Sequence, residues 1–276
     1  MSKVDLHLHT TASDGSFSPA ELVAEAEEKD LAVIAVTDHD TVAGVSQALE
    51  AAEDKKVEVI PGIEFTTYVN SQRVDILGYD IDYEEEDLLN IINKLQNARK
   101  IRAQKILDKL EKLEVELDFA KLQDLAGETG IGRPHIARLM VKEGYVNNMQ
   151  QAFDDYLEDG GPAYVPKYKL EPSEAVDLIK GAEGRAVLAH PGEIEDRALV
   201  QELIAVDGLE GIEAYYSGHT KEQTEYFLNL AAKNNLFVTG GSDCHGPANE
   251  DKYLIGTVDI PYQVVEAFSY QLSTIS

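Results

Sequence analysis

The stretch SPAELVAEAEEKDLAVIAVTDHD, residues 18–40, decides the fold. Its first part predicts a helix over 18–30, because Ser18 is a suitable N-cap, Pro19 takes the first helical position and Glu21 stands three residues after the cap. Its second part begins with the apolar run LAVIAV, which is typical of a buried strand, and ends in polar residues. A helix of this length next to a buried strand indicates a parallel α/β sheet.

The same alternation extends on both sides of this stretch. We expect further helices at 41–55, 172–182, 195–206 and 220–234. We expect further strands at 4–10, 57–69, 73–81, 185–191, 211–217 and 236–245. About seven strands separated by helices favour a closed or nearly closed α/β barrel over an open sheet.

The middle of the chain differs from both ends. Residues 84–164 read as almost entirely helical and begin with a long charged helix, so we interpret them as a helical insertion into the barrel. The barrel domain then comprises residues 1–83 and 165–276, and DGGPAYVPKY, residues 159–168, returns the chain to it. A free-standing coiled coil is the alternative for the long helix, but its apolar pattern does not keep a heptad for long enough.

Composition restricts the partners. The 276 residues carry 24 Lys and Arg against 51 Asp and Glu, a formal net charge of −27. Such an acidic protein repels nucleic acid at long range, which argues against duplex DNA as a partner but not against a small phosphorylated substrate. The single cysteine, Cys244, excludes an internal disulfide. The start of the chain does not resemble a signal peptide, and the run at 31–36 is far shorter than the ~18 residues of a membrane span. We expect a cytoplasmic protein without membrane contact.

Five of the seven histidines lie at or just after the ends of expected strands, each near a carboxylate. Catalytic groups of barrel enzymes gather at the carboxyl ends of their strands, and imidazole with carboxylate is a ligand set for Zn²⁺, Mn²⁺ or Fe²⁺. Each motif alone has a simpler explanation: HLH is a coincidence, TDHD caps a helix, AHPG is a turn and SDCH is a polar loop. Their common position at strand ends favours a site with several metal ions.

The motifs DLHLHTTASDG, VTDHDT, PGIEF, LAHP and GGSDCH, in this order, resemble those of the PHP (polymerase and histidinol phosphatase) family. The resemblance implies a distorted (βα)₇ TIM-like barrel, two or three divalent metal ions and phosphoester hydrolysis by hydroxide. We expect Mn²⁺, with Zn²⁺ and Fe²⁺ as alternatives. Aspartate at position 75 departs from the histidine that is usual in the family. The implied metal ligands are His7, His9, Asp14, His39, Glu64, Asp75, His190, Asp243 and His245, in three sets of which the first two share Glu64.

The insertion narrows the expected substrate. GRPHIAR, residues 132–138, precedes and opens a helix, and amide groups at a helix start with Arg and His nearby suit an anion. With GGPAYVP it resembles a PHP subgroup of nucleoside 3′,5′-bisphosphate phosphatases and 5′→3′ exonucleases acting on short RNA. By this resemblance Arg133 and His135 bind the phosphates of the substrate, and Arg138 on the first turns of the same helix is expected to join them. Asp243 and His219 are the candidate catalytic residues, and His219, expected near the barrel mouth, would be a substrate contact or general acid. Histidinol-phosphate phosphatase and a non-catalytic, metal-stabilised module are the alternatives.

Overall fold

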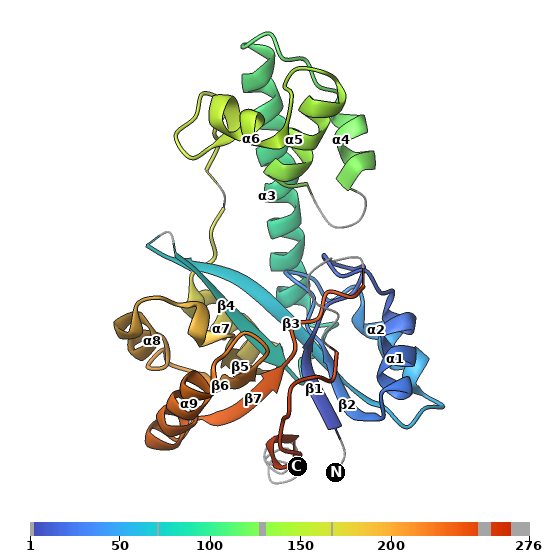
Figure 1. The fold of residues 1–276 in the computed structure, drawn as a ribbon, viewed down its shortest axis with the longest axis vertical. Helices are drawn as coiled ribbons and strands as arrows, with labels where there is room; N and C mark the ends of the chain where they lie inside the picture. The colour runs from blue at the N-terminus through green and yellow to red at the C-terminus, as the bar shows by residue number, and fades with distance from the viewer. Residues whose placement is uncertain (1–2, 71, 127–130, 167, 248–254, 266–276) are drawn as a thin grey trace. The chain divides into compact units, whose positions relative to one another are not determined.

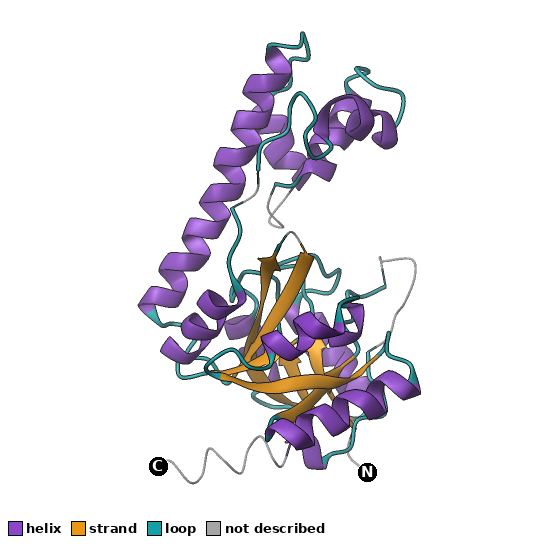
Figure 2. Ribbon diagram, turned by 90° about the vertical axis from the view of Figure 1, so that its left-hand side faces the viewer, coloured by secondary structure: helices purple, strands orange, loops and turns teal. Residues whose placement is uncertain are grey.

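The computed structural model describes residues 3–70, 72–126, 131–166, 168–247 and 255–265. The chain divides into two compact units. We call Met1–Leu89 with Leu170–Ser276 the barrel unit, and Asn90–Lys169 the helical unit. Strands and helices make up the first, and the described residues of the second form helices and loops (Figures 1 and 2). That the helical insertion sets substrate specificity stays a prediction.

Seven strands of the barrel unit form one sheet in chain order. They are β1 (Lys3–Leu8), β2 (Leu31–Val36), β3 (Glu58–Val69), β4 (Gln72–Tyr79), β5 (Arg185–Leu188), β6 (Leu209–Tyr216) and β7 (Phe237–Gly241). The first strand also meets the last, because Asp243 N donates to His7 O at 2.9 Å and Leu8 forms a parallel bridge with Cys244. The predicted α/β barrel is therefore confirmed, and it is nearly closed.

One strand departs from a uniformly parallel barrel. β4 runs antiparallel to both β3 and β5, whereas β1, β2 and β3 are mutually parallel, as are β5, β6 and β7. The reason is the short connection between β3 and β4, since a parallel crossover needs about a dozen residues or more. Asn70, in the left-handed region with φ 47°, begins this turn. The last pair before it joins Val69 to Gln72.

The helices of the barrel unit are α1 (Pro19–Glu28), α2 (Val45–Ala52), α7 (Pro172–Gly181), α8 (Arg197–Leu203) and α9 (Lys221–Asn234). The predicted N-terminus of α1 is confirmed, because Ser18 Oγ accepts from Glu21 N while Glu21 accepts from Ser18 N. α1 packs on α2 and β2, and α9 packs on β6 and β7 (Figure 1). Helices thus cover the outer face of the parallel strands.

The barrel closes through close contact between its first and last strands. A Cβ atom on Gly241 would lie 2.2 Å from His7 Cβ and 2.5 Å from His7 N, so only glycine lets β7 approach β1 this closely. Tyr79 is fully buried, and its hydroxyl donates to Leu6 O at 2.8 Å, which ties β4 to β1. These contacts fix the backbone beside His7.

The helical unit has a core of its own. Its helices are α3, which begins in the barrel unit and spans Glu86–Glu111, α4 (Phe119–Ala126), α5 (Arg133–Lys142), α6 (Met149–Ala152) and the π-helix η2 (Phe153–Leu157). Ile106, Leu110, Leu122, Ile136 and Met140 belong to its buried cluster. Within the described residues, no helix combines the length and the apolar character that crossing a membrane requires.

Candidate metal centre

Nine side chains converge in the barrel unit, and they come from strands β1, β3 and β4 and from the loops that follow β1, β2, β5 and β7. Most line one pocket, of about 370 Å³, together with Arg73 and Glu193. His7 and His9 lie on and just after β1, where alternate residues point to the same side. All nine residues that the sequence singled out as metal ligands are brought together in three groups, two of which share His9. Their role as ligands stays a prediction.

The first group combines His7, His9 and Asp243. Asp243 Oδ1 lies 3.5 Å from His7 Nε2 and 3.0 Å from His9 Nε2. Glu64 Oε2 lies 3.4 Å from each of the same two imidazole nitrogens. Two imidazoles and two carboxylates thus face a common point.

The second group combines Glu64, Asp75 and His190, all buried. His190 Nε2 lies 3.1 Å from Glu64 Oε1 and 3.6 Å from Asp75 Oδ2. Glu64 therefore turns one oxygen to this group and the other to the first, which is the arrangement a carboxylate needs to bridge two cations.

The third group combines His9, Asp14, His39 and His245. Asp14 Oδ1 lies 3.3 Å from His245 Nε2 and 3.8 Å from His9 Nδ1, and Asp14 Oδ2 lies 3.9 Å from His39 Nε2. His39 Nδ1 also lies 2.9 Å from Glu64 Oε2. Since His9 belongs to both this group and the first, the groups are contiguous.

The buried polar atoms of the site suit divalent cations. Among the described residues, His7 Nε2, both ring nitrogens of His9, Glu64 Oε2 and Asp75 Oδ1 are buried without a hydrogen-bond partner. Leaving such groups unpaired costs about 1–3 kcal/mol each, and coordination of a cation would remove that cost. Imidazole nitrogens mixed with carboxylate oxygens are the donor set of Zn²⁺, Fe²⁺ and Mn²⁺ sites, so the residues fit the metals that the sequence implied.

The electrostatics of the pocket favour an ionised Glu64, whereas burial and the charge of Glu64 raise the pKa of Asp75 to about 6. Burial by itself would raise the pKa of Glu64, but the charges of His39 and His7 and a hydrogen bond from His190 hold it well below its usual range. Burial opposes protonation of His39, yet the neighbouring Glu64 raises its pKa to about 9. The imidazoles must lose protons to bind a metal, so metal binding here would release protons.

Strained backbone positions two of the candidate ligands. Asp243 has φ 57° and His190 has φ 23°, both in the sparsely populated left-handed region. Each residue follows directly on a strand or its extension, and the 3₁₀ turn Pro191–Glu193 begins after His190. Such conformations cost of order 1–3 kcal/mol each and persist only where the surrounding structure fixes them, most often at functional sites.

A fully buried carboxylate that the sequence analysis missed contacts the imidazole of His7 and the backbone of His190, which belong to two different groups. Glu213, on β6, places Oε1 3.1 Å from His7 Nδ1, and its Oε2 accepts from His190 N at 2.8 Å. The contact orients His7 so that Nε2 faces the first group. A single acid in the apolar strand GIEAYY, residues 211–216, is the pattern that could have revealed it.

Arg73 is the second residue that the sequence analysis missed. Its Nε donates to Asp75 Oδ2 at 2.6 Å, and its Nη2 lies 3.2 Å from His39 Nε2. The Arg73 side chain is 51% exposed, whereas Asp75 is buried. Residues 73 and 75 share one face of β4, which is the periodicity that could have linked them. A permanent cation thus contacts candidate ligands of two groups.

We expect Arg73→Gln to tighten metal binding by roughly tenfold, because removing the cation relieves its repulsion of a metal ion and frees two candidate ligand atoms. Competition with a chromophoric chelator measures the dissociation constant. Arg73→Lys, which keeps the charge, is the control. Weaker binding by Arg73→Gln would mean that Arg73 mainly orients Asp75.

Asp38, next to His39, has a structural role. It accepts hydrogen bonds from Thr10 N and Ser13 Oγ at 2.7 and 2.6 Å, and a third from Thr10 Oγ1. These bonds hold the loop that follows β1 and carries His9 and Asp14.

His219 lies in the barrel unit with both ring nitrogens in contact with the backbone. Its Nε2 accepts from Gly192 N at 3.0 Å, and its Nδ1 lies 3.0 Å from Ala214 O. Burial lowers its pKa, which fits a neutral ring that donates through Nδ1 and accepts through Nε2. In this arrangement His219 positions Gly192, two residues after His190. The general-acid role of His219 stays a prediction, and both of its ring nitrogens are engaged by backbone atoms in this structure.

The expected substrate residues lie at the start of α5 in the helical unit; Gly130, just before GRPHIAR, lies outside the described residues. Arg133 donates to Leu157 O at 2.9 Å and to Asp159 Oδ1 at 2.6 Å. His135 Nδ1 accepts from Gly132 N at 3.1 Å and caps the helix. Arg138 is exposed on α5. The structure therefore gives Arg133 and His135 local structural contacts, and their substrate contacts stay a prediction.

Comparisons with known proteins agree with this geometry. The PHP domain model matches residues 5–238. A 5′-3′ exoribonuclease of Haemophilus influenzae is 35% identical over 250 residues, which cover 89% of this chain and 90% of that protein. A 3′,5′-nucleoside bisphosphate phosphatase of Chromobacterium violaceum is 32% identical over 266 residues, covering 95% and 93%.

A solved structure from Chromobacterium violaceum, described as an amidohydrolase with bound sulfate and no metal, has the same fold. Its TM-score is 0.76 at 31% identity, and the match covers 96% of each chain. The family model spans most of the barrel unit, and the relatives are similar over nearly their whole length. The chain therefore belongs to the PHP domain family of metal-dependent phosphoesterases.

Proposed function

We propose that the protein removes the 3′-phosphate of nucleoside 3′,5′-bisphosphates, leaving the 5′-monophosphate, and also acts on short 5′-phosphorylated RNA. The observation that carries this proposal is the convergence of three candidate ligand groups on Glu64. The relatives named for these two substrates, similar over about nine-tenths of the chain, support the choice of substrate class.

The site would hold two or three divalent cations, with Mn²⁺ favoured and Zn²⁺ or Fe²⁺ as alternatives. The donor set of five imidazoles and four carboxylates supports this assignment, since carboxylate oxygens suit Mn²⁺ and imidazoles suit Zn²⁺ and iron. Bound cations of this kind lower the pKa of water to produce a nucleophile and stabilise charge on phosphoryl oxygens.

Neighbouring residues of the protein would fix the orientation and tautomer of the candidate metal ligands. Glu64 would span two groups with its two oxygens, and Glu213 would hold His7 in one tautomer through Nδ1. The Tyr216 hydroxyl lies 3.1 Å from Asp243 Oδ2 and 2.9 Å from Glu193 Oε1, and it can donate to only one of them at a time. Donation to Asp243 would direct the other oxygen of that carboxylate to His7 and His9.

The helical unit would contribute substrate contacts. Arg133, His135 and Arg138 are the candidates, because they lie at the N-terminal half of α5 and carry donors suited to phosphate. The described contacts of Arg133 leave Arg138 as the more accessible cation of this set. Asp243 is the candidate catalytic carboxylate.

We expect phosphate release from adenosine 3′,5′-bisphosphate in the presence of Mn²⁺, with AMP as the second product. Removing metals with EDTA should abolish turnover, and adding Mn²⁺ should restore it, because the proposed nucleophile is a water activated by the bound cations. A phosphate assay with chromatography of the nucleotide measures both. Histidinol phosphate and a short 5′-phosphorylated RNA are assayed in parallel.

The outcomes separate the alternatives. Turnover of RNA without turnover of the bisphosphate would make the protein an exonuclease with the same metal site. Turnover of histidinol phosphate alone would contradict the proposed substrate class. No turnover of any of the three by metal-loaded, folded protein would support the non-catalytic alternative.

A further inference from the structure

The charge of the chain is divided unequally between its two units. Residues 90–169 contain 13 Lys and Arg against 12 Asp and Glu, a net charge of +1, whereas the rest contains 11 against 39, a net charge of −28. The helical unit is therefore nearly neutral in a chain of net charge −27. The basic residues of this unit are concentrated on α3.

Four cations of α3 lie on one face of the helix. Lys94, Arg102, Lys105 and Lys109 are separated by 8, 3 and 4 residues, so at 3.6 residues per turn they fall within about 80° of one another. Lys94, Lys105 and Lys109 are exposed, and Arg102 is half-buried. From Lys94 to Lys109 the face extends for about 22 Å.

The segment after η2 lies beside these cations, with the ring of Tyr168 next to Lys94. Lys94 Nζ is 5.3 Å from the centroid of the Tyr168 ring, which is 40% exposed. Lys109 Nζ donates to Tyr164 O, and Arg102 Nε donates to Val165 O at 2.8 Å. We call Lys94, Arg102, Lys105, Lys109 and Tyr168 the basic strip. All five residues belong to the helical unit.

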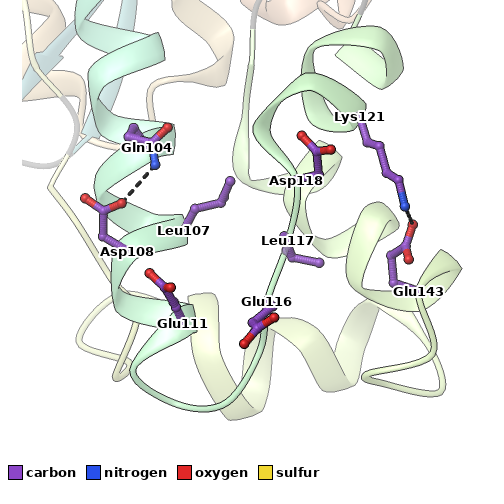
Figure 3. A pocket seen from close by; sticks show the side chains of 9 residues that line it. All are labelled: Gln104, Leu107, Asp108, Glu111, Glu116, Leu117, Asp118, Lys121 and Glu143. Carbon is purple, nitrogen blue, oxygen red and sulfur yellow. Dashed lines mark hydrogen bonds and ion pairs between the residues drawn. The ribbon is translucent and has the colours of Figure 1, made fainter.

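A different face of α3 has the opposite character. Gln104, Asp108 and Glu111 line a cavity of about 430 Å³ there, together with Glu116, Asp118 and Glu143 (Figure 3). Gln104 bonds to Asp108, and Lys121, the one basic side chain lining this cavity, is paired with Glu143. The acidic cavity repels anions, so this face of α3 does not suit a nucleic acid.

We propose that the basic strip binds single-stranded nucleic acid, which deepens the proposed function by giving its RNA substrate a second binding surface. Cations spaced along a groove track a phosphate backbone, and exposed aromatic rings stack on bases without sequence preference. A length of about 22 Å suits an oligonucleotide of roughly four nucleotides or more, the lower end of known single-strand site sizes. An acidic protein is the alternative partner, and its surface would pair with the cations of the strip but would not need the exposed ring of Tyr168 for stacking.

The test measures binding rather than turnover. Full-length protein in EDTA is titrated into a six-nucleotide, 5′-phosphorylated RNA labelled at its 3′ end, and anisotropy is followed at several salt concentrations. We expect the logarithm of the affinity to fall with the logarithm of salt, with a slope of about −0.7 per phosphate contact. Lys94→Gln/Lys105→Gln should reduce the steepness of that slope by about 1.4. Tyr168→Ala should weaken binding by at least about fivefold.

Two controls make the result decisive. Lys94→Arg/Lys105→Arg keeps the charge and should keep the binding, and Lys221→Gln removes an exposed cation of the barrel unit and should change little. Equal RNA binding by the wild type and Lys94→Gln/Lys105→Gln would overturn the proposal that the basic strip binds RNA. Salt-sensitive self-association of the wild type without RNA binding would also overturn it. Hydrolysis of adenosine 3′,5′-bisphosphate by the wild type is scored separately, so failure of the strip is distinguishable from failure of the proposed function.

Discussion

Replacing Glu64 with glutamine is expected to lower kcat/KM for phosphate release by about 1000-fold or more. Glu64 is 1% exposed and lies within 3.5 Å of imidazoles from all three ligand groups. The amide keeps the size of the side chain but loses the negative charge and one acceptor oxygen. Loss of a bridging carboxylate removes several kcal/mol of charge stabilisation, and each 1.36 kcal/mol corresponds to a factor of ten in rate.

Steady-state kinetics and metal content by elemental analysis check this prediction together. We expect Glu64→Gln to bind less metal than the wild type, and Glu64→Asp to retain part of both metal and activity because the charge remains. Circular dichroism and thermal unfolding show whether each variant is folded. A folded Glu64→Gln protein with full metal content and near wild-type kcat/KM would contradict the bridging role.

Replacing Glu213 with glutamine is expected to lower metal affinity or activity by about 10- to 100-fold. Glu213 touches no candidate metal position, yet it is fully buried and contacts both His7 and the backbone of His190. The carboxylate requires a proton on His7 Nδ1 and so leaves Nε2 free to ligate. Glutamine can present its amide nitrogen instead, which would favour the other tautomer.

The control for Glu213 is chosen on the same strand. Glu210→Gln removes a carboxylate of β6 that is paired with Arg185 at 3.2 Å and does not contact a candidate ligand. We expect Glu210→Gln to retain metal affinity while Glu213→Gln loses it, measured by chelator competition at constant pH. An equal loss in both variants would assign Glu213 a role in the stability of β6 alone.

The sequence predicted those parts of the fold that depend on local pattern. The buried runs and the capping residues of α1 lie in single stretches, so their periodicity was sufficient to place them. Most of the nine ligand candidates could be grouped because parallel strands bring their carboxyl ends to one edge of a barrel, whereas Asp75 lies on the antiparallel β4. The antiparallel β4 follows from the short link after Val69.

The remaining features depend on pairs of residues far apart in sequence. Glu213 and His7 are separated by 206 positions, so their contact can be recognised only once β6 and β1 are placed in the barrel. The contacts of Arg73 with His39 and of His219 with Gly192 likewise arise from packing of separate loops. Composition alone also concealed the basic strip, since a net charge of −27 averages over two units of very different charge.

The meeting of β1 with β7 has a consequence for biosynthesis. Asp5 accepts hydrogen bonds from Ser242 N and Gly256 N, and His7 O accepts from Asp243 N, so residues from the two ends of the chain complete the barrel. A nascent chain that ends after β6 already carries seven of the nine candidate ligands but cannot close the barrel around them. Contacts of such long sequence separation form late in folding. If these residues are the metal ligands, we expect metal binding to follow synthesis of the whole barrel, because a chain truncated after β6 would lack Asp243 and His245 and the geometry to discriminate among cations.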